Sequence, residues 1–198
     1  MFSGLFLYDA AMLFLGIDLG ASALKLILID ATGSPVAHIA APVDTLNPTL
    51  GTFATAEQDP SAWLITLETL LDNLFSNSPV KPEDITALSI TAGTHIAVLC
   101  DDDMHPIRNA IMWSDQRAAS IMSKLTTSKD MIVAESLHAP NPTWTLAHLA
   151  WLTENDPEAM HKTQMILPAK DWLRYCLTGH IATDLSCLLY TSDAADEV

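Results

Sequence analysis

The chain has 198 residues, of which 49% are hydrophobic and only 17% charged, so it can bury a sizeable core and wholesale disorder is excluded. Nine Lys and Arg against 24 Asp and Glu give a formal net charge of −15, which excludes a basic track for a nucleic acid. The three cysteines, Cys100, Cys176 and Cys187, are widely spaced and form no metal-binding pattern, which favours a reducing, cytoplasmic location.

The N-terminal stretch from Met1 to Ile17 is apolar but carries no early Lys or Arg, and Asp9 interrupts it. We therefore expect neither a signal peptide nor a membrane span. Met12 is a candidate start of the native protein, which would make residues 1–11 an upstream extension.

Hydrophobic periodicity predicts a series of strands followed by a mostly helical section. Asp59 is expected to cap a long helix with Pro60 at its first position, and Gly179 to end the last helix. Strands preceding and following one crossover helix predict an α/β architecture with a mixed sheet and flanking helices. The expected elements are strands over 13–18, 24–30 and 36–43, irregular chain over 44–58, a helix over 60–76, strands over 85–91, 95–100 and 109–113, a helix from 114 or 115 to 126, helices over 144–155, from 157 and over 170–177, and an extended segment over 165–167.

The first stretch that carries chemistry is a predicted hairpin, Gly16-Ile17-Asp18-Leu19-Gly20-Ala21-Ser22. Gly20 allows close approach of the backbone to a ligand, and Ser22 with the N–H groups of the turn can bind phosphate oxygens. Asp18 can hold Mg²⁺ directly or through water. Phosphoryl transfer depends mainly on positioning and charge neutralisation, so this turn is suited to it. The alternative is an ordinary hairpin with one acid and one glycine.

The second such stretch runs from Asn109 to Arg117. Trp113 offers a flat apolar wall to the C–H face of a sugar. Asp115 can accept hydrogen bonds from hydroxyl groups, and Arg117 can hold that carboxylate in place. The alternative is a buried Trp113 beside a helix-capping Asp115 paired to Arg117.

Together the two stretches resemble the FGGY family of carbohydrate kinases. Residues 16–30 resemble its opening phosphate-binding hairpin, and residues 109–117 its Trp-x-Asp-x-Arg segment. Glu57-Gln58-Asp59-Pro60 with Trp63 resembles the acidic segment before its first long helix. Further matches follow in the family's order and extend the resemblance over residues 13–186: Trp151–Glu158, Lys170–Tyr175, Leu177-Thr178-Gly179 and Thr183-Asp184.

The resemblance implies an actin-like, ribonuclease-H-like fold, with residues 12–186 forming an incomplete amino-terminal, sugar-binding domain. It implies an ATP-dependent kinase that transfers the γ-phosphate of ATP to a sugar hydroxyl, with Mg²⁺ as counter-charge. The expected partners are a small sugar and ATP, with no nucleic acid and no membrane, and a homodimer at full length.

The resemblance also assigns roles to residues. Asp18 becomes the acid near Mg²⁺ and the transferred phosphate, and Gly20, Ser22 and Lys25 become phosphate-binding residues. In the second stretch, Trp113 and Asp115 become parts of the sugar pocket, supported by Arg117. Ala21 and Ala23 stand where the family usually has Thr and often Ser, which removes hydroxyl groups but leaves the backbone amides.

Residues 91–95 resemble the xylulokinase segment in which a Met-His pair touches the sugar. His95 is kept, whereas Thr94 replaces Met and Gly93 replaces Gln. The Arg-Glu pair of glycerol kinases is not found there, which favours a ketose such as xylulose, or a sugar acid, over glycerol. We expect Thr94 and His95 to contact the sugar; the alternative for His95 is an ordinary hydrogen bond at the start of a strand.

Family members are much longer, and the resemblance places their general base, an Asp in a Gly-Asp segment, beyond this sequence. We therefore expect this fragment to be inactive alone. Residues 187–198 resemble translated adapter sequence and are interpreted as a non-native tail. The alternative function is a non-catalytic, actin-like sugar-binding or interaction domain, whereas a nicotinamide-dependent dehydrogenase is disfavoured because no G-x-G-x-x-G follows a strand.

Overall fold

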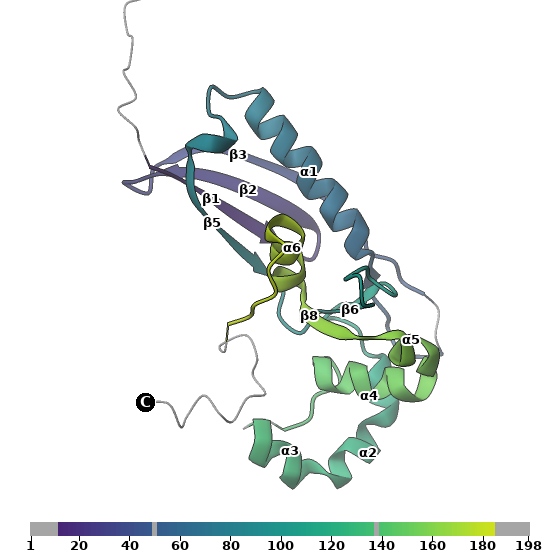
Figure 1. Ribbon diagram of the computed structural model, residues 1–198. Coiled ribbons are helices and arrows are strands. Elements are labelled where there is room, and N and C mark those ends of the chain that lie inside the picture. Colours follow the sequence, from purple (N-terminus) through teal and green to yellow (C-terminus); the bar gives the residue numbers. More distant parts are fainter. Residues whose placement is uncertain (1–11, 49–50, 137–138, 185–198) are drawn as a thin grey trace, which may run out of the picture.

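A computed structural model describes residues 12–48, 51–136 and 139–184 of the chain, so the expectations for residues 1–11 and 187–198 lie outside the described residues. Figure 1 shows an elongated molecule with a sheet at one end and short helices at the other. The strands are β1 Leu13–Leu19, β2 Ala23–Asp30, β3 Pro35–Pro42, β4 Glu57–Gln58, β5 Ile85–Ala92, β6 Ala97–Cys100, β7 Ala110–Ile111 and β8 Met165–Pro168. The helices are α1 Pro60–Ser76, α2 Met122–Thr127, α3 Lys129–Ser136, α4 Thr145–Asn155, α5 Pro157–Lys162 and α6 Ala169–Thr178, with 3₁₀ turns η1 Pro82–Asp84 and η2 Arg117–Ile121.

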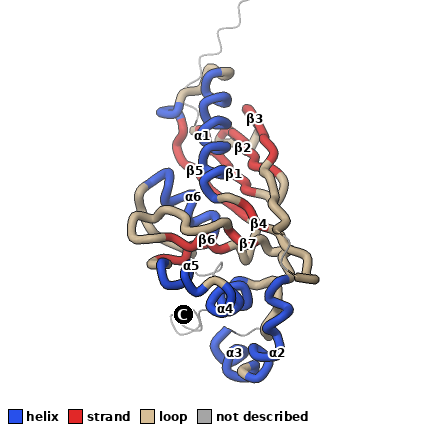
Figure 2. Tube along the Cα trace, turned by 90° about the vertical axis from the view of Figure 1, so that its right-hand side faces the viewer, coloured by secondary structure: helices blue, strands red, loops and turns tan. Residues whose placement is uncertain are grey.

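The main sheet has four strands in the order β3-β2-β1-β5. β1 runs antiparallel to β2 and parallel to β5, and β2 runs antiparallel to β3. Side chains alternate between the faces of a strand, and in β1 the odd-numbered residues from Leu13 to Leu19 are buried. The same face of the sheet is covered by α1, which lies along it in Figure 2.

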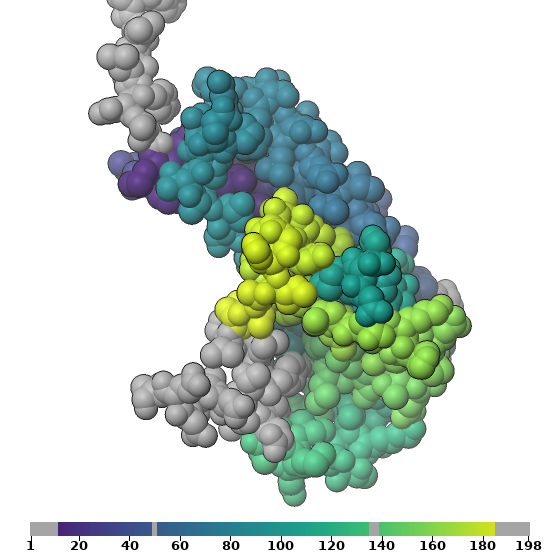
Figure 3. All heavy atoms as spheres, in the orientation of Figure 1, coloured from purple at the N-terminus to yellow at the C-terminus, as the bar shows by residue number. Residues whose placement is uncertain are grey.

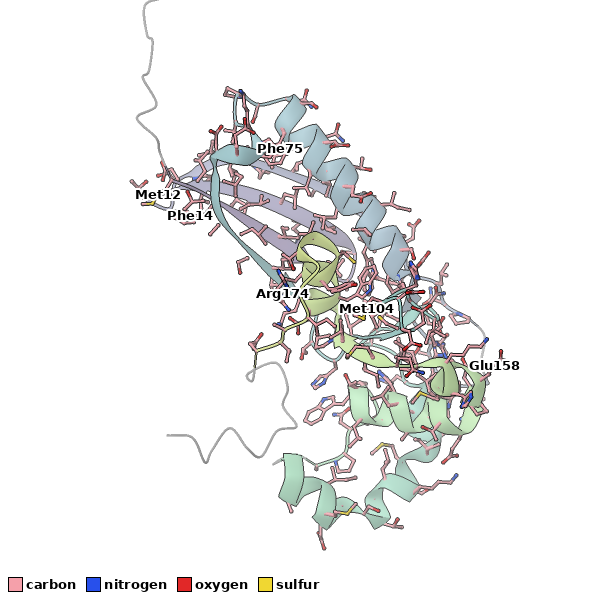
Figure 4. All side chains as sticks on the ribbon, in the orientation of Figure 1. Met12, Phe14, Phe75, Met104, Glu158 and Arg174 are labelled. Atoms are coloured by element: carbon pink, nitrogen blue, oxygen red, sulfur yellow. The ribbon has the colours of Figure 1, made fainter. Side chains whose placement is uncertain are left out.

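The core lies between the sheet and the apolar side of α1. Trp63, Leu67, Leu70 and Leu74 recur at helical spacing and are all buried. Figure 4 labels Phe75 of α1, which packs against this core, and Phe14 of β1, which belongs to the other face of the sheet. The face opposite α1 therefore carries Phe14, Gly16 and Asp18 from β1.

Two small ladders, β4 with β7 and β6 with β8, join the sheet to the helical end of the molecule. α6 completes the core, and its Trp172 lies edge-to-face with Trp63, with ring centroids 6.4 Å apart. Figure 3 shows α6 and the residues after it, in yellow, at the waist between the sheet and the green α4 and α5. No helix of the described ranges is both long and apolar enough to cross a membrane.

Most expected elements are confirmed, but three local expectations are wrong. The helix expected from residue 114 or 115 begins as η2, whose N-cap position is Gln116, although the Asp115 carboxylate accepts a hydrogen bond from the N–H of Arg117, the first residue of η2. The strand expected from His95 starts only at Ala97, since His95 has a left-handed φ of 57°. The strand over 109–113 shortens to β7, whose partner β4 forms within the stretch expected to be irregular.

Candidate functional site

The turn between β1 and β2 is built with its carbonyl groups turned inward. The N–H of Gly20 donates to the carbonyl of Ala23 at 3.0 Å, and the N–H of Val43 donates to the carbonyl of Ser22 at 3.0 Å. The carbonyl of Ala21 accepts a hydrogen bond from the side chain of Gln58. A Cβ atom on Gly20 would lie 3.1 Å from the Ala23 carbonyl oxygen, so glycine suits the tight closure of this turn.

Asp18 and Lys25 face each other beside this turn. They are paired residues of β1 and β2, and the Nζ of Lys25 lies 3.1 Å from the Oδ2 of Asp18. Both side chains are exposed to solvent, so the pair contributes little to stability. This geometry leaves a carboxylate and an ammonium group accessible at the position where the sequence predicts phosphate and Mg²⁺.

The segment after β5 lies directly beside the turn. Asp18 pairs with Thr91 in the parallel ladder, and the N–H of Gly93 donates to the carbonyl of Leu19 at 3.2 Å. A Cβ atom on Gly93 would lie 3.6 Å from Cδ1 of Trp113. The structure therefore brings the predicted phosphate turn, the 93–95 segment and Trp113 together, although they are far apart in sequence.

A pocket of about 140 Å³ opens at this place, and Gly93, Thr94, His95, Thr145 and Lys170 contribute to its lining. The ring of His95 stacks on Trp144 with centroids 4.8 Å apart and an interplanar angle of 12°. Both predicted sugar contacts of this segment, Thr94 and His95, thus line one cavity. Trp113 is half exposed nearby, at 49% of its surface.

Asp115 and Arg117 lie behind this surface, where Asp115 is completely buried and Arg117 is 1% exposed. The Oδ1 of Asp115 accepts from the backbone N–H and the Nε of Arg117, and Oδ2 accepts from the Arg117 Nη2 and the Ala56 N–H, all at 2.6–2.9 Å. Burial raises the pKa of Asp115, but the hydrogen bonds from Arg117 and Ala56 and the charge of Arg117 outweigh it and lower the pKa overall. The protein itself thus supplies four hydrogen bonds to the Asp115 carboxylate.

Glu57 extends this buried cluster to a second arginine. Its Oε1 accepts from the Nη1 of Arg117 and from the Nη2 of Arg108, both at 2.7 Å. Arg108 also donates to Asp156 at 2.8 Å, and the Arg117 guanidinium lies 5.1 Å from the ring centroid of Trp151. The cluster therefore joins β4, the segment before β7, η2 and the helices α4 and α5.

Four residues of the site region had no role assigned from the sequence: Glu57, Gln58, His148 and Lys170. Glu57 and Gln58 belong to the acidic motif before α1, and the sequence signal for them is a pair of polar residues immediately before the helix cap Asp59. Lys170 pairs with Asp171 at 2.8 Å and Asp184 at 2.6 Å and lines the pocket. His148 is 4% exposed, and burial lowers its pKa to about 4.

Comparison with known proteins assigns this chain to a family. The model of the N-terminal domain of the FGGY family of carbohydrate kinases matches residues 13–191. Among curated relatives, the xylulose kinase of Bacillus subtilis is 32% identical over 173 residues, covering 87% of this chain and 34% of the relative. The chain therefore spans about a third of the length of the curated relatives it matches.

Solved structures agree on the fold. A xyloylose kinase from Brucella ovis superposes with a TM-score of 0.83 and 29% identity over 91% of this chain and 37% of that one. A gluconate kinase from Lactobacillus acidophilus gives a TM-score of 0.81 at 23% identity over 91% of this chain and 36% of that one, a likeness of fold alone. The fold is the actin-like, ribonuclease-H-like one, and the chain belongs to the FGGY family of carbohydrate kinases.

Proposed function

We propose that this chain is the amino-terminal part of an ATP-dependent kinase that phosphorylates a ketose such as xylulose. The observation that carries the proposal is the hydrogen bond from the Gly93 N–H to the Leu19 carbonyl at 3.2 Å. It fixes the turn suited to phosphate against the segment that leads into the pocket. Donor phosphate and acceptor hydroxyl would then meet at one end of the sheet, which is the positioning that phosphoryl transfer requires.

Each site residue has a role in this proposal. The backbone N–H of Ser22 would hold phosphate oxygens, with Lys25 supplying positive charge, whereas Gly20, whose N–H donates to the Ala23 carbonyl, would let the turn close tightly beside them. Thr94 and His95 would contact sugar hydroxyls within the pocket, and Trp113 would pack against the C–H face of the sugar. Asp115 and Arg117 would act from behind, by holding Trp113 and its neighbours in position.

The turn offers Mg²⁺ one protein carboxylate, that of Asp18. Mg²⁺ bound with nucleotide phosphates takes one or two protein carboxylates and keeps several waters, and Asp18 offers one accessible carboxylate beside the turn. No cluster of three or more potential metal-ligating side chains occurs within the residues that the structure describes. When bound, the ion would neutralise charge on the phosphates, and Asp18 would hold it or orient its waters.

The choice of a ketose rests on the relatives rather than on the fold. Several curated relatives with 30–32% identity to this chain are named xylulose kinases, whereas a gluconate kinase shares the fold equally well, with a TM-score of 0.81. The family consists of kinases, which favours an enzyme over the alternative of a non-catalytic sugar-binding or interaction domain. We further propose a cytoplasmic enzyme whose partners are sugar and ATP, and a homodimer at full length.

The test is a coupled ADP-release assay on the full-length gene product with pentuloses, hexuloses, aldonic acids and polyols. We expect turnover to be fastest with a pentulose. Trp113→Ala should raise the KM for the sugar about 10-fold or more, because the residue loses a large apolar contact area. Ile65→Ala, at an exposed position of α1, is the matched control and should leave kcat and KM unchanged. Turnover confined to polyols, or absent with all sugars, would contradict the proposal.

A further inference from the structure

Gln58 is the most completely bonded polar side chain beside the predicted phosphate turn. It is fully buried, at 0% exposure. Its Nε2 donates to the Ala21 carbonyl at 2.7 Å and to the Thr45 Oγ1 at 2.8 Å, and its Oε1 accepts from the Trp63 Nε1 at 3.0 Å. The indole N–H can only donate, so the amide oxygen must face Trp63 and the amide nitrogen must face Ala21.

The bond to Ala21 determines where the next N–H points. The Ala21 carbonyl and the Ser22 N–H belong to one planar trans peptide, so they point in opposite directions. Because Gln58 holds the carbonyl on the protein side, the Ser22 N–H is directed outward. Within the described residues, no hydrogen bond has the N–H of Ala21 or Ser22 as its donor. Such outward amides in a turn are suited to an anion.

Glu57, the neighbour of Gln58 in β4, supports the buried cluster of Asp115 and Arg117. Adjacent side chains of a strand point to opposite sides, and Glu57 binds Arg117 and Arg108 while Gln58 binds the turn. β4 therefore contacts both the phosphate turn and the cluster behind Trp113. These contacts come from two consecutive residues of one strand, so the phosphate turn and the Asp115–Arg117 cluster share one support.

We propose that Gln58 is a positioning residue for phosphoryl transfer, which aims the Ser22 N–H at the phosphate by holding the Ala21 carbonyl. The proposal rests on the proposed kinase function. Gln58 does not touch a ligand itself, because it is buried beneath the turn. Its loss should affect the chemical step and leave sugar binding intact.

The kinetic test compares two variants of the full-length protein. Gln58→Met keeps the length of the side chain but removes its three hydrogen bonds, whereas Thr45→Val removes only the bond from the same amide to an exposed threonine. We expect Gln58→Met to lower kcat by about 10- to 100-fold, as a misplacement of about 1 Å does, with the sugar KM changed by less than about threefold. Thr45→Val should change either constant by less than about twofold. An unchanged kcat in Gln58→Met would overturn the proposal.

Two further measurements separate positioning from misfolding and from an error in the proposed function. Gln58→Glu keeps the acceptor for Trp63 and loses only the donors, so a wild-type kcat in this variant would also overturn the proposal. In the 198-residue chain, ¹⁵N relaxation of the Ser22 amide needs neither sugar nor nucleotide. We expect lower order at Ser22 in Gln58→Met and Gln58→Glu than in Thr45→Val. Equal order in all three variants would overturn the proposal, even if the full-length protein proved not to be a kinase.

Discussion

At the scale of single residues, Asp115 is the clearest case of a side chain that serves the fold and the site together. It receives four hydrogen bonds in a fully buried position, and three of them come from Arg117. Removing one partner of such a pair leaves an uncompensated buried charge. The energetic importance of this contact therefore follows from burial rather than from distance.

We expect Asp115→Asn to lower the free energy of unfolding by about 3–5 kcal/mol, since Arg117 would keep as its charged partner only Glu57, which it shares with Arg108. Glu158→Gln is a matched control, because Glu158 pairs with Lys162 at the same 2.7 Å but at the surface, where such a pair contributes less than about 1 kcal/mol. Urea denaturation of the chain measures both. Similar losses in the two variants would show that burial does not strengthen the Asp115–Arg117 pair.

His148 should make the stability of the chain sensitive to mild acid. Burial lowers its pKa to about 4; the charge of Arg117 and His95 also lowers it, whereas Asp115 raises it. The unfolded chain, with a pKa near 6.5, binds a proton at higher pH than the folded one. The unfolded state then holds more protons between these values, so stability falls as the pH drops from about 6.5 toward 4.

The expected loss from this one group is about 2 kcal/mol by pH 5. His148→Leu should flatten the dependence of the urea midpoint on pH between 7 and 5, whereas His105→Gln, at an exposed position, should leave it as in the wild type. A His148→Leu variant with the same pH dependence as the wild type would contradict the assignment.

The sequence could predict only the local part of the residue-scale picture. The pairing of Arg117 with Asp115 follows from a separation of two residues, and it was expected. The contacts of Glu57 with Arg117 and of Ala56 with Asp115 join residues about 60 positions apart. Local propensity contains no information about such partners. Burial of Asp115 is therefore not predictable from the sequence, in which the carboxylate stands out only as an acceptor for hydroxyl groups.

At the scale of elements, the long periodic segments were predicted well and the short ones were not. α1 begins and ends where its cap and periodicity indicated, because Asp59, Pro60 and four buried apolar residues agree on the same helix. β4 has two residues and no periodicity, and it exists because β7 lies opposite it. η2 stands in place of a regular first turn, and the Asp115 carboxylate accepts a hydrogen bond from the N–H of its first residue, Arg117.

The N-cap of α1 offers a test at this scale. The Oδ1 of Asp59 accepts from the N–H of Ser61 at 2.9 Å, so Asp59→Ala should cost about 1 kcal/mol of stability. Glu68→Ala, at an exposed position in the middle of the same helix, should change stability by less than about 0.5 kcal/mol. Thermal and urea unfolding followed by circular dichroism would compare the two. Equal effects would mean that the cap contributes nothing specific.

At the scale of the whole molecule, the charge is unbalanced far beyond what ion pairs can compensate. In the described ranges, eight of the nine Lys and Arg side chains already lie within 4.0 Å of a carboxylate. The formal net charge of −15 therefore reflects an excess of acids over cations that are mostly paired already. Their mutual repulsion opposes the compact state.

Salt should consequently stabilise this chain rather than weaken it. Raising the ionic strength from about 0.01 M to 0.1 M shortens the Debye length from about 30 Å to about 10 Å, which screens the repulsion between exposed acids. The pairs of Arg117 are buried and are screened much less. We expect the urea midpoint to rise with NaCl and equally with KCl, and to rise as much in Glu158→Gln as in the wild type. A midpoint that falls with salt would mean that surface ion pairs contribute more to stability than the excess negative charge removes.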